Sequence, residues 1–269
     1  MSTLAVSQLS KHFESFEALR DINLSLDSGE FVALVGASGC GKSTLLRIIG
    51  GLETRTIGSL RIDGREITAP GRDRAMVFQD YSLYPWLSVT ENVRFCRGLK
   101  AYSKGQTNAS IGDAIRRANL LIELMGLSRV RDSSPAQLSG GMRQRVAIAR
   151  ALMAQPEFLL MDEPFGALDT QTREVMHDLI LHVKERERCG ILFVTHDVEE
   201  AVYLADRVVV LAPNPGHIDS VWHISLPQRT QELKMAPEFL QYKREITQRI
   251  RVTTGMVSDL SALQALATA

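Results

Sequence analysis

Short runs of apolar residues alternate along this chain with longer segments in which apolar residues recur at helical spacing. Nearly uninterrupted apolar runs are typical of strands buried on both faces of a parallel sheet, and they occur at residues 31–35, 75–78, 158–161, 191–194 and 208–211. Between two of these runs, residues 170–188 carry Val175, Leu179 and Val183 four residues apart, which predicts an amphipathic helix. The pattern as a whole predicts an α/β fold around a parallel sheet.

Two regions depart from this pattern. Residues 3–27 and 58–64 show polar–apolar alternation with an Asp-Gly turn, which predicts antiparallel strands beside the main sheet. Residues 88–153 contain helical segments, such as 111–125, and no convincing strand, which predicts a helical insertion in the α/β core. After about residue 218 the chain is polar, and one further helix is expected at residues 237–251.

Composition and charge narrow the function classes. The 269 residues are 45% hydrophobic and 23% charged, which excludes disordered and fibrous proteins. Lys plus Arg and Asp plus Glu both number 31, so bulk charge does not favour nucleic-acid binding. Three widely spaced cysteines form no disulfide framework or zinc site, which favours a reducing compartment. The sequence shows neither a secretory signal nor an apolar run approaching 18 residues, so we expect a soluble cytoplasmic protein.

Residues 36–44 match the phosphate-loop pattern G-x-x-x-x-G-K-[ST] between a buried strand and the start of a helix. Glycines let successive backbone N–H groups point inward around phosphate, and the helix N-terminus adds partial positive charge. Lys42 can reach the β- and γ-phosphates, and the Ser43 hydroxyl can ligate Mg²⁺. We interpret Cys40 as an ordinary loop residue, the alternative being a thiol whose pKa is lowered by Lys42. The loop predicts a nucleoside triphosphate site made by Gly36, Ala37, Ser38, Gly39, Cys40, Gly41, Lys42, Ser43 and Thr44.

Two carboxylates, Asp162 and Glu163, end the apolar run at 158–161. Acids at the C-terminal end of a buried parallel strand face the crevice in which α/β sheets bind ligands. Because adjacent strand residues point in opposite directions, the two acids should have different roles. We expect Asp162 to hold Mg²⁺ and Glu163 to take a proton from an attacking water. The alternative is a strand that simply ends in polar residues.

Residues 138–145, Leu-Ser-Gly-Gly-Met-Arg-Gln-Arg, look like the signature sequence of ATP-binding-cassette (ABC) ATPases. Other motifs of the same family occur in the family's order along the chain. These are Gln79 after a strand, Asp169 after the two acids, and His196 after the strand at 191–194, so the resemblance covers residues 3–218. It implies a P-loop NTPase fold, with a RecA-like parallel sheet core, an antiparallel β subdomain and an inserted α-helical subdomain. The expected organisation is a nucleotide-binding core at residues 1–80 and 155–218, a helical signature subdomain at 81–154, and a C-terminal helical tail at 219–269.

The resemblance also implies the composition of the complete site. In the family, the helix that begins at Ser139, Gly140 and Gly141 closes over the γ-phosphate held by a second cassette, and two ATP molecules lie head to tail between the chains. A helix N-terminus with a free hydroxyl can bind an anion in this way. An ordinary helix cap is the alternative.

Further roles are implied by resemblance for single residues. Gln79 would touch Mg²⁺ and the attacking water, and His196 would hydrogen-bond the γ-phosphate. Asp169 would lie at the dimer interface. Phe13 would stack on adenine, with a core role as the alternative because Phe16 lies three residues later.

The number of cassettes and the length of the insertion limit which class of ABC protein this chain resembles. It has one cassette, and its insertion is too short for the long coiled coil of the family's DNA-repair members. A transporter subunit remains, working with separate multi-span membrane permease chains and a separate solute-binding protein. Residues 73–79 and 83–87 resemble the nitrate/sulfonate/taurine importers, which usually have Leu where this chain has Tyr84. The permease would dock near Tyr84, Pro85 and Trp86, unless Trp86 is a core residue.

We therefore expect the ATP-hydrolysing subunit of an ABC importer for a small anion such as nitrate, a sulfonate or taurine, or bicarbonate. It would bind ATP and Mg²⁺, pair with a second cassette, and lie at the cytoplasmic face of the inner membrane. The alternatives are a non-transport ABC ATPase, an importer ATPase for another solute, another P-loop class such as a GTPase or kinase, and a binding-only module. The tail helix is expected to pack on its own domain rather than on lipid, through Phe239, Ile246 and Ile250.

Overall fold

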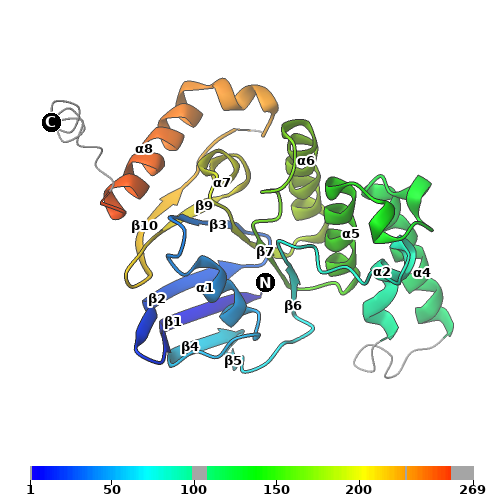
Figure 1. Ribbon diagram of the computed structural model, residues 1–269, viewed down its shortest axis with the longest axis horizontal. Helices are drawn as coiled ribbons and strands as arrows, with labels where there is room; N and C mark the ends of the chain where they lie inside the picture. Colours follow the sequence, from blue (N-terminus) through cyan, green and yellow to red (C-terminus); the bar gives the residue numbers. More distant parts are fainter. Residues whose placement is uncertain (1, 99–107, 228, 256–269) are drawn as a thin grey trace, which may run out of the picture.

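The centre of the fold is a sheet with the strand order β10-β9-β3-β8-β7-β6 (Figure 1). The computed structural model describes residues 2–98, 108–227 and 229–255. The parallel strands correspond to the five apolar runs: β3 (Phe31–Gly36), β6 (Arg74–Val77), β7 (Phe158–Asp162), β8 (Gly190–Val194) and β9 (Arg207–Ala212). Every residue of β3, β7 and β8 is buried, as expected for strands covered on both faces. The expected α/β fold with a P-loop core is confirmed.

The strand β10 (His217–His223) was not predicted, because residues after 218 were expected to be polar tail with one helix. It pairs antiparallel with β9 at the edge of the central sheet. All of its residues are exposed or half-buried, so it lacks the continuous buried apolar run that marks an inner strand. The domain boundaries stay predictions, but β10 crosses the one expected at residue 218.

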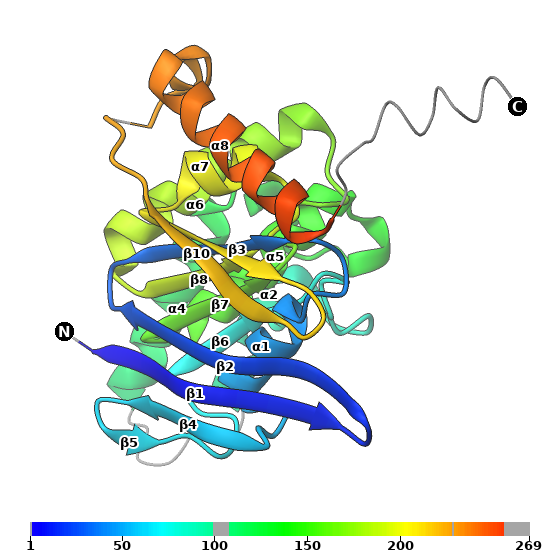
Figure 2. The same ribbon diagram turned by 90° about the vertical axis from the view of Figure 1, so that its left-hand side faces the viewer.

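An antiparallel sheet lies beside the core, as the alternation at residues 3–27 and 58–64 predicted. It contains β1 (Thr3–Phe13), β2 (Phe16–Asp27), β4 (Ile57–Ile62) and β5 (Arg65–Glu66), in the order β2-β1-β4-β5. Helix α1 (Lys42–Ile49) lies between the two sheets (Figure 2). Its Leu45 and Ile49 pack in one apolar cluster with residues of both sheets, so the phosphate loop at its start is held on a rigid base.

The helical insertion lies beyond β6 (Figure 1). It comprises α2 (Val89–Arg94), the 3₁₀ turn η1 (Phe95–Gly98), α4 (Asn108–Leu124), the turns η2 (Ser128–Val130) and η3 (Pro135–Gln137), and α5 (Gly140–Met153). A capping box between Ser88 and Glu91 starts α2. Apolar side chains of α2, α4 and α5 pack together, including Val93, Leu121 and Val146. The described part of residues 88–153 is helical and loop-like, as predicted.

The remaining helices cover the face of the central sheet opposite α1. They are α6 (Thr170–Glu187), α7 (Val198–Leu204), the turn η4 (Gln231–Met235) and α8 (Pro237–Thr253). Phe239 and Ile246 of α8 are fully buried in the main core cluster, and Ile250 packs against it. The expectation that the tail helix packs on its own domain is therefore confirmed. Among the residues that the structure describes, we find no helix with the length and apolar character needed to cross a bilayer.

Replacing Phe239 tests how strongly α8 is attached to the core. Phe239→Ala leaves a cavity at a fully buried position, so we expect the free energy of unfolding to fall by about 3–5 kcal/mol in urea denaturation. The neighbouring Leu240 is 48% exposed, and Leu240→Ala should change that free energy by less than about 1 kcal/mol. Equal effects of the two substitutions would show that α8 does not depend on the Phe239 contact.

Candidate active site

The phosphate loop joins the C-terminal end of β3 to the N-terminus of α1. A Cβ atom on Gly36 would lie 2.4 Å from the Leu211 carbonyl oxygen, and one on Gly41 would lie 2.5 Å from Leu19 Cδ2. Gly41 also has a φ of +97°, in the left-handed region that glycine adopts readily. The Lys42 ammonium group donates hydrogen bonds to the carbonyls of Gly36 and Ala37, at 2.9 Å each. The loop is thus curled around its own lysine, with no room for side chains at these two glycines.

Cys40 of the loop is fully buried, and its Sγ lies 3.7 Å from Lys42 Nζ. Burial raises the pKa of the Cys40 thiol, and this effect exceeds the opposing effect of the Lys42 charge. A thiol with a lowered pKa, the alternative considered from sequence, is therefore not what the structure shows.

Ser43 and Asp162 meet where α1 begins and β7 ends. The Ser43 hydroxyl donates a hydrogen bond of 2.9 Å to Asp162 Oδ1. Burial raises the pKa of Asp162, and the adjacent Glu163 acts in the same direction, while the Ser43 hydrogen bond opposes the shift. A hydroxyl and a carboxylate side by side are oxygen donors of the kind Mg²⁺ takes, with phosphate and water as its other ligands. The two residues fit the predicted Mg²⁺ site.

Glu163 comes directly after β7 and faces His196. Its backbone has a φ of +44°, and its N–H donates to the Val194 carbonyl at 3.0 Å. Its Oε2 lies 3.2 Å from His196 Nδ1, and the His196 side chain is 62% exposed. The adjacent acids therefore have different partners, Ser43 for Asp162 and His196 for Glu163, while their different roles stay a prediction. A carboxylate next to a histidine can accept and pass on a proton.

A buried network behind His196 was missed from sequence. Thr195 Oγ1 donates to Glu200 Oε2 at 2.7 Å, and Glu200 is only 4% exposed. Arg173 of α6 lies 3.5 Å from Glu200 Oε1 and donates to the Leu168 carbonyl at 3.0 Å. Arg173 therefore connects the segment before Asp169 with the segment that carries His196. The sequence did offer one sign of this network. Glu200 is a charged residue in a part of α7 that is otherwise apolar and packs inward.

Gln79 lies two residues beyond β6, at the same edge of the sheet as the acids. Val77 of β6 is in register with Met161 of β7, the residue before Asp162. Gln79 is exposed, so its side chain is accessible from this edge. The structure thus brings Lys42, Ser43, Gln79, Asp162, Glu163 and His196 to the C-terminal edge of neighbouring strands.

The signature residues lie elsewhere. Ser139 is the exposed N-cap of α5 and accepts a hydrogen bond from the Met142 N–H at 3.3 Å. A Cβ on Gly141 would be 2.4 Å from Thr172 Cγ2, so the tip of α5, including Gly140, adjoins the start of α6. Asp169 caps α6 by accepting from the Thr172 N–H at 2.9 Å, which lowers the pKa of Asp169. Figure 1 shows α5 on the far side of the β6 edge from α1.

The residues expected to contact adenine and the permease lie at or near the surface. Phe13 ends β1 and is 42% exposed, with the Lys11 ammonium 4.4 Å from its ring centroid, and its role with adenine stays a prediction. Trp86 is 74% exposed, which rules out the core alternative. Pro85 is exposed, and the Tyr84 ring lies 5.5 Å from that of Trp86.

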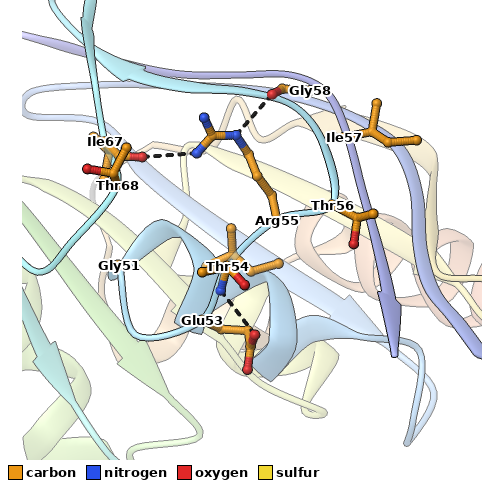
Figure 3. A pocket seen from close by; sticks show the side chains of 10 residues that line it. Gly51, Glu53, Thr54, Arg55, Thr56, Ile57, Gly58, Ile67 and Thr68 are labelled. Carbon is orange, nitrogen blue, oxygen red and sulfur yellow. Dashed lines mark hydrogen bonds between the residues drawn. The ribbon is translucent and has the colours of Figure 1, made fainter. Parts of the chain in front are cut away.

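A separate hollow of about 380 Å³ lies between the end of α1 and β4 (Figure 3). Arg55 fills part of it and donates to the carbonyls of Gly58 and Ile67, at 2.9 and 3.0 Å. Its lining residues include Glu53 and Thr56 and none of the predicted site residues. We therefore assign the chemistry to the strand edge and not to this hollow.

Comparison with known proteins agrees with this geometry. The family model described as "ABC transporter" matches residues 19–166. The nitrate import ATP-binding protein NrtD of Synechocystis is 49% identical over 244 residues, covering 88% of this chain and 89% of NrtD. The bicarbonate transport ATP-binding protein CmpC of Synechococcus elongatus is 42% identical, covering 90% of this chain but 37% of the longer CmpC.

A solved structure gives the same fold. It is a dimeric ATP-binding cassette in a post-hydrolysis state, bound to ADP and Pi, and it matches with a TM-score of 0.72 at 32% identity. The match covers 83% of this chain and all of that one.

The buried Asp162 gives a prediction with a defined sign. Because burial raises its folded-state pKa, ionised Asp162 destabilises the folded chain above that pKa, and the penalty disappears below the unfolded-state pKa. In buffer without nucleotide or Mg²⁺, we expect Asp162→Asn to raise the melting temperature near neutral pH and to have little effect near about pH 4. The same variant should lose at least about a hundredfold in ATP turnover. A lower melting temperature at neutral pH would contradict this account of Asp162.

Proposed function

Since this chain belongs to the ABC transporter family, whose ATP-binding subunits are ATPases, we propose that it powers an importer for a small anion. The observation that carries this proposal is the placement of two pairs, Ser43 with Asp162 and Glu163 with His196, beside the phosphate loop. The first pair supplies oxygen ligands for a metal, and the second supplies a base and its partner.

Each group in the site has a distinct task in hydrolysis. Lys42 would give up its hydrogen bonds to the loop carbonyls and bind the β- and γ-phosphates of ATP instead. Glu163 would orient a water and take its proton while His196 holds the γ-phosphoryl group in line. Mg²⁺, held by Ser43 and Asp162 with Gln79 beside them, would neutralise charge on the phosphate oxygens when bound. Adenine would stack on Phe13.

The second half of the site would come from another chain. Ser139 is exposed and Gly140 is half-buried at the start of α5, which lies away from the chain's own phosphate loop (Figure 1). A second cassette, placed head to tail, would present this tip to the γ-phosphate, with Asp169 at the interface. The dimeric state of the related solved cassette supports this arrangement.

The membrane partners would dock at the exposed Pro85 and Trp86 and the half-buried Tyr84. An exposed tryptophan beside a second aromatic ring is a typical anchor in protein interfaces. Multi-span permease subunits would bind there, so the ATPase would lie peripherally at the cytoplasmic face of the membrane. A separate solute-binding protein would deliver the solute.

The solute class rests on the relatives. NrtD is named for nitrate and CmpC for bicarbonate. Nitrate and bicarbonate are both small planar oxyanions. We propose nitrate, bicarbonate or a sulfonate such as taurine as the cargo. Co-purification of the chain with a permease, followed by uptake of labelled solute in vesicles, tests this choice against a non-transport ATPase.

Replacing the proposed base separates binding from turnover. We expect Glu163→Gln to reduce ATP hydrolysis by about 10²–10⁴-fold, because the amide cannot accept the proton. ATP affinity by calorimetry should change little, and a stable ATP-bound dimer should appear in size-exclusion chromatography. Turnover at the wild-type rate would remove Glu163 from its role.

Replacing the exposed tryptophan separates hydrolysis from transport. Trp86→Ala should leave intrinsic hydrolysis by the isolated chain within about twofold and lower solute uptake by the assembled complex at least about tenfold. Leu240→Ala, which removes an exposed apolar side chain on α8, is the matched control and should leave both unchanged. Normal uptake with Trp86→Ala would contradict docking at this surface.

A further inference from the structure

The segment Tyr81–Trp86, which follows Gln79, lies against the signature helix α5. At the tip of α5, the Tyr81 hydroxyl is 3.3 Å from where a Cβ of Gly140 would stand. One turn further, the guanidinium carbon of Arg143 lies 5.5 Å from the Tyr81 ring centroid. The segment therefore touches the very end of the helix that carries Ser139.

Arg150 fastens the same segment to the far end of α5. Its guanidinium donates to the Ser82 carbonyl at 2.7 Å and to the Tyr81 carbonyl at 3.1 Å. Its Cζ also lies 5.6 Å from the Tyr84 ring centroid, within the range of a cation–π contact. One side chain of α5 thus binds three residues of the segment.

The backbone of the segment needs such support. Tyr81 and Ser82 have φ values of +64° and +45°, and two consecutive non-glycine residues in this region are unfavourable without outside contacts. The two carbonyls that Arg150 binds belong to these two residues. The guanidinium fork can serve both at once, which a single ammonium group cannot do as well.

Beyond Tyr84 the connection continues to the exposed tryptophan. The Tyr84 ring lies 5.5 Å from the Trp86 ring and 4.1 Å from the Phe95 ring. The Asn92 side chain of α2 binds the Tyr84 backbone, accepting from its N–H at 2.9 Å and donating to its carbonyl at 3.1 Å. Trp86 is thus attached through Tyr84 to Arg150.

We propose that Arg150 is a positioning residue that joins the Trp86 surface and the Ser139 tip into one rigid unit. Because an α-helix is stiff, Arg150 and Ser139 move together although they lie about 16 Å apart along α5. A permease that displaces Trp86 would thereby displace the signature tip. In the other direction, closure of the tip on ATP would displace Trp86. This inference rests on the proposed ATP-driven pairing of cassettes.

Tryptophan fluorescence tests the inference in the isolated chain. The chain has two tryptophans, so Trp222→Phe leaves Trp86 as the sole emitter. In a Glu163→Gln, Trp222→Phe parent, we expect Mg²⁺ and ATP to change the Trp86 emission as the dimer closes. Adding Arg150→Met should reduce that change at least about fivefold, while the ATP dissociation constant stays within about twofold.

Arg145→Met is the matched control, because Arg145 is on the same helix but binds the Met125 carbonyl at 2.9 Å. It should keep the full Trp86 response. Arg150→Lys keeps the charge but serves one carbonyl better than two, so it should lose at least half of the response. If Arg150→Met does not fold, the Trp86 response of Arg150→Lys tests the role of Arg150.

Three outcomes have different meanings. A full Trp86 response in a folded Arg150→Met protein, or in Arg150→Lys when the methionine variant does not fold, overturns the role of Arg150. A parent that binds ATP and dimerises without any Trp86 response also overturns it, while the proposed function stands. A parent that binds no ATP contradicts the proposed function itself, and the inference falls with it.

Discussion

The distance between the phosphate loop and the tip of α5 is the constraint on which the rest of the structure depends. Lys42 and Ser43 stand at the ends of the inner strands, whereas Ser139 caps a helix beyond the β6 edge (Figure 1). Both are helix N-termini with N–H groups available to an anion. Under the proposed function, one chain would carry two phosphate-binding elements in different places, and a second chain would be needed to bring them to one nucleotide.

The contacts around the site connect the parts that must move together. Arg173 links the Leu168 carbonyl with Glu200, which holds Thr195 next to His196. Arg150 links α5 with the segment leading to Trp86. Both arginines bind backbone carbonyls through a planar group with several donors, which suits a joint between segments. The surfaces proposed for the nucleotide, the second cassette and the permease would thus be joined mechanically within one chain.

Much of this was predictable because local chemistry determined it. Apolar runs marked the inner strands, and the phosphate loop was recognisable from its glycine and lysine pattern, although the steric reason for glycine at positions 36 and 41 comes from the structure. The edge strand β10 was not predictable from hydrophobicity, because one face and one edge of it meet solvent. The contacts of Arg150 and Arg173 were missed for another reason. They join residues whose proximity depends on tertiary packing, and arginines on helices are most often solvated.

Mixed dimers test the central claim, that each ATP is held by the phosphate loop of one chain and the signature tip of another. In a Glu163→Gln background, Lys42→Ala and Ser139→Arg chains should each fail to retain ATP when alone. Their mixture contains one intact composite site, so we predict that about one ATP per mixed dimer is retained after gel filtration with Mg²⁺. If each site used the tip of its own chain, every chain in the mixture would be defective. Retention no greater than in the separate variants would then contradict the account.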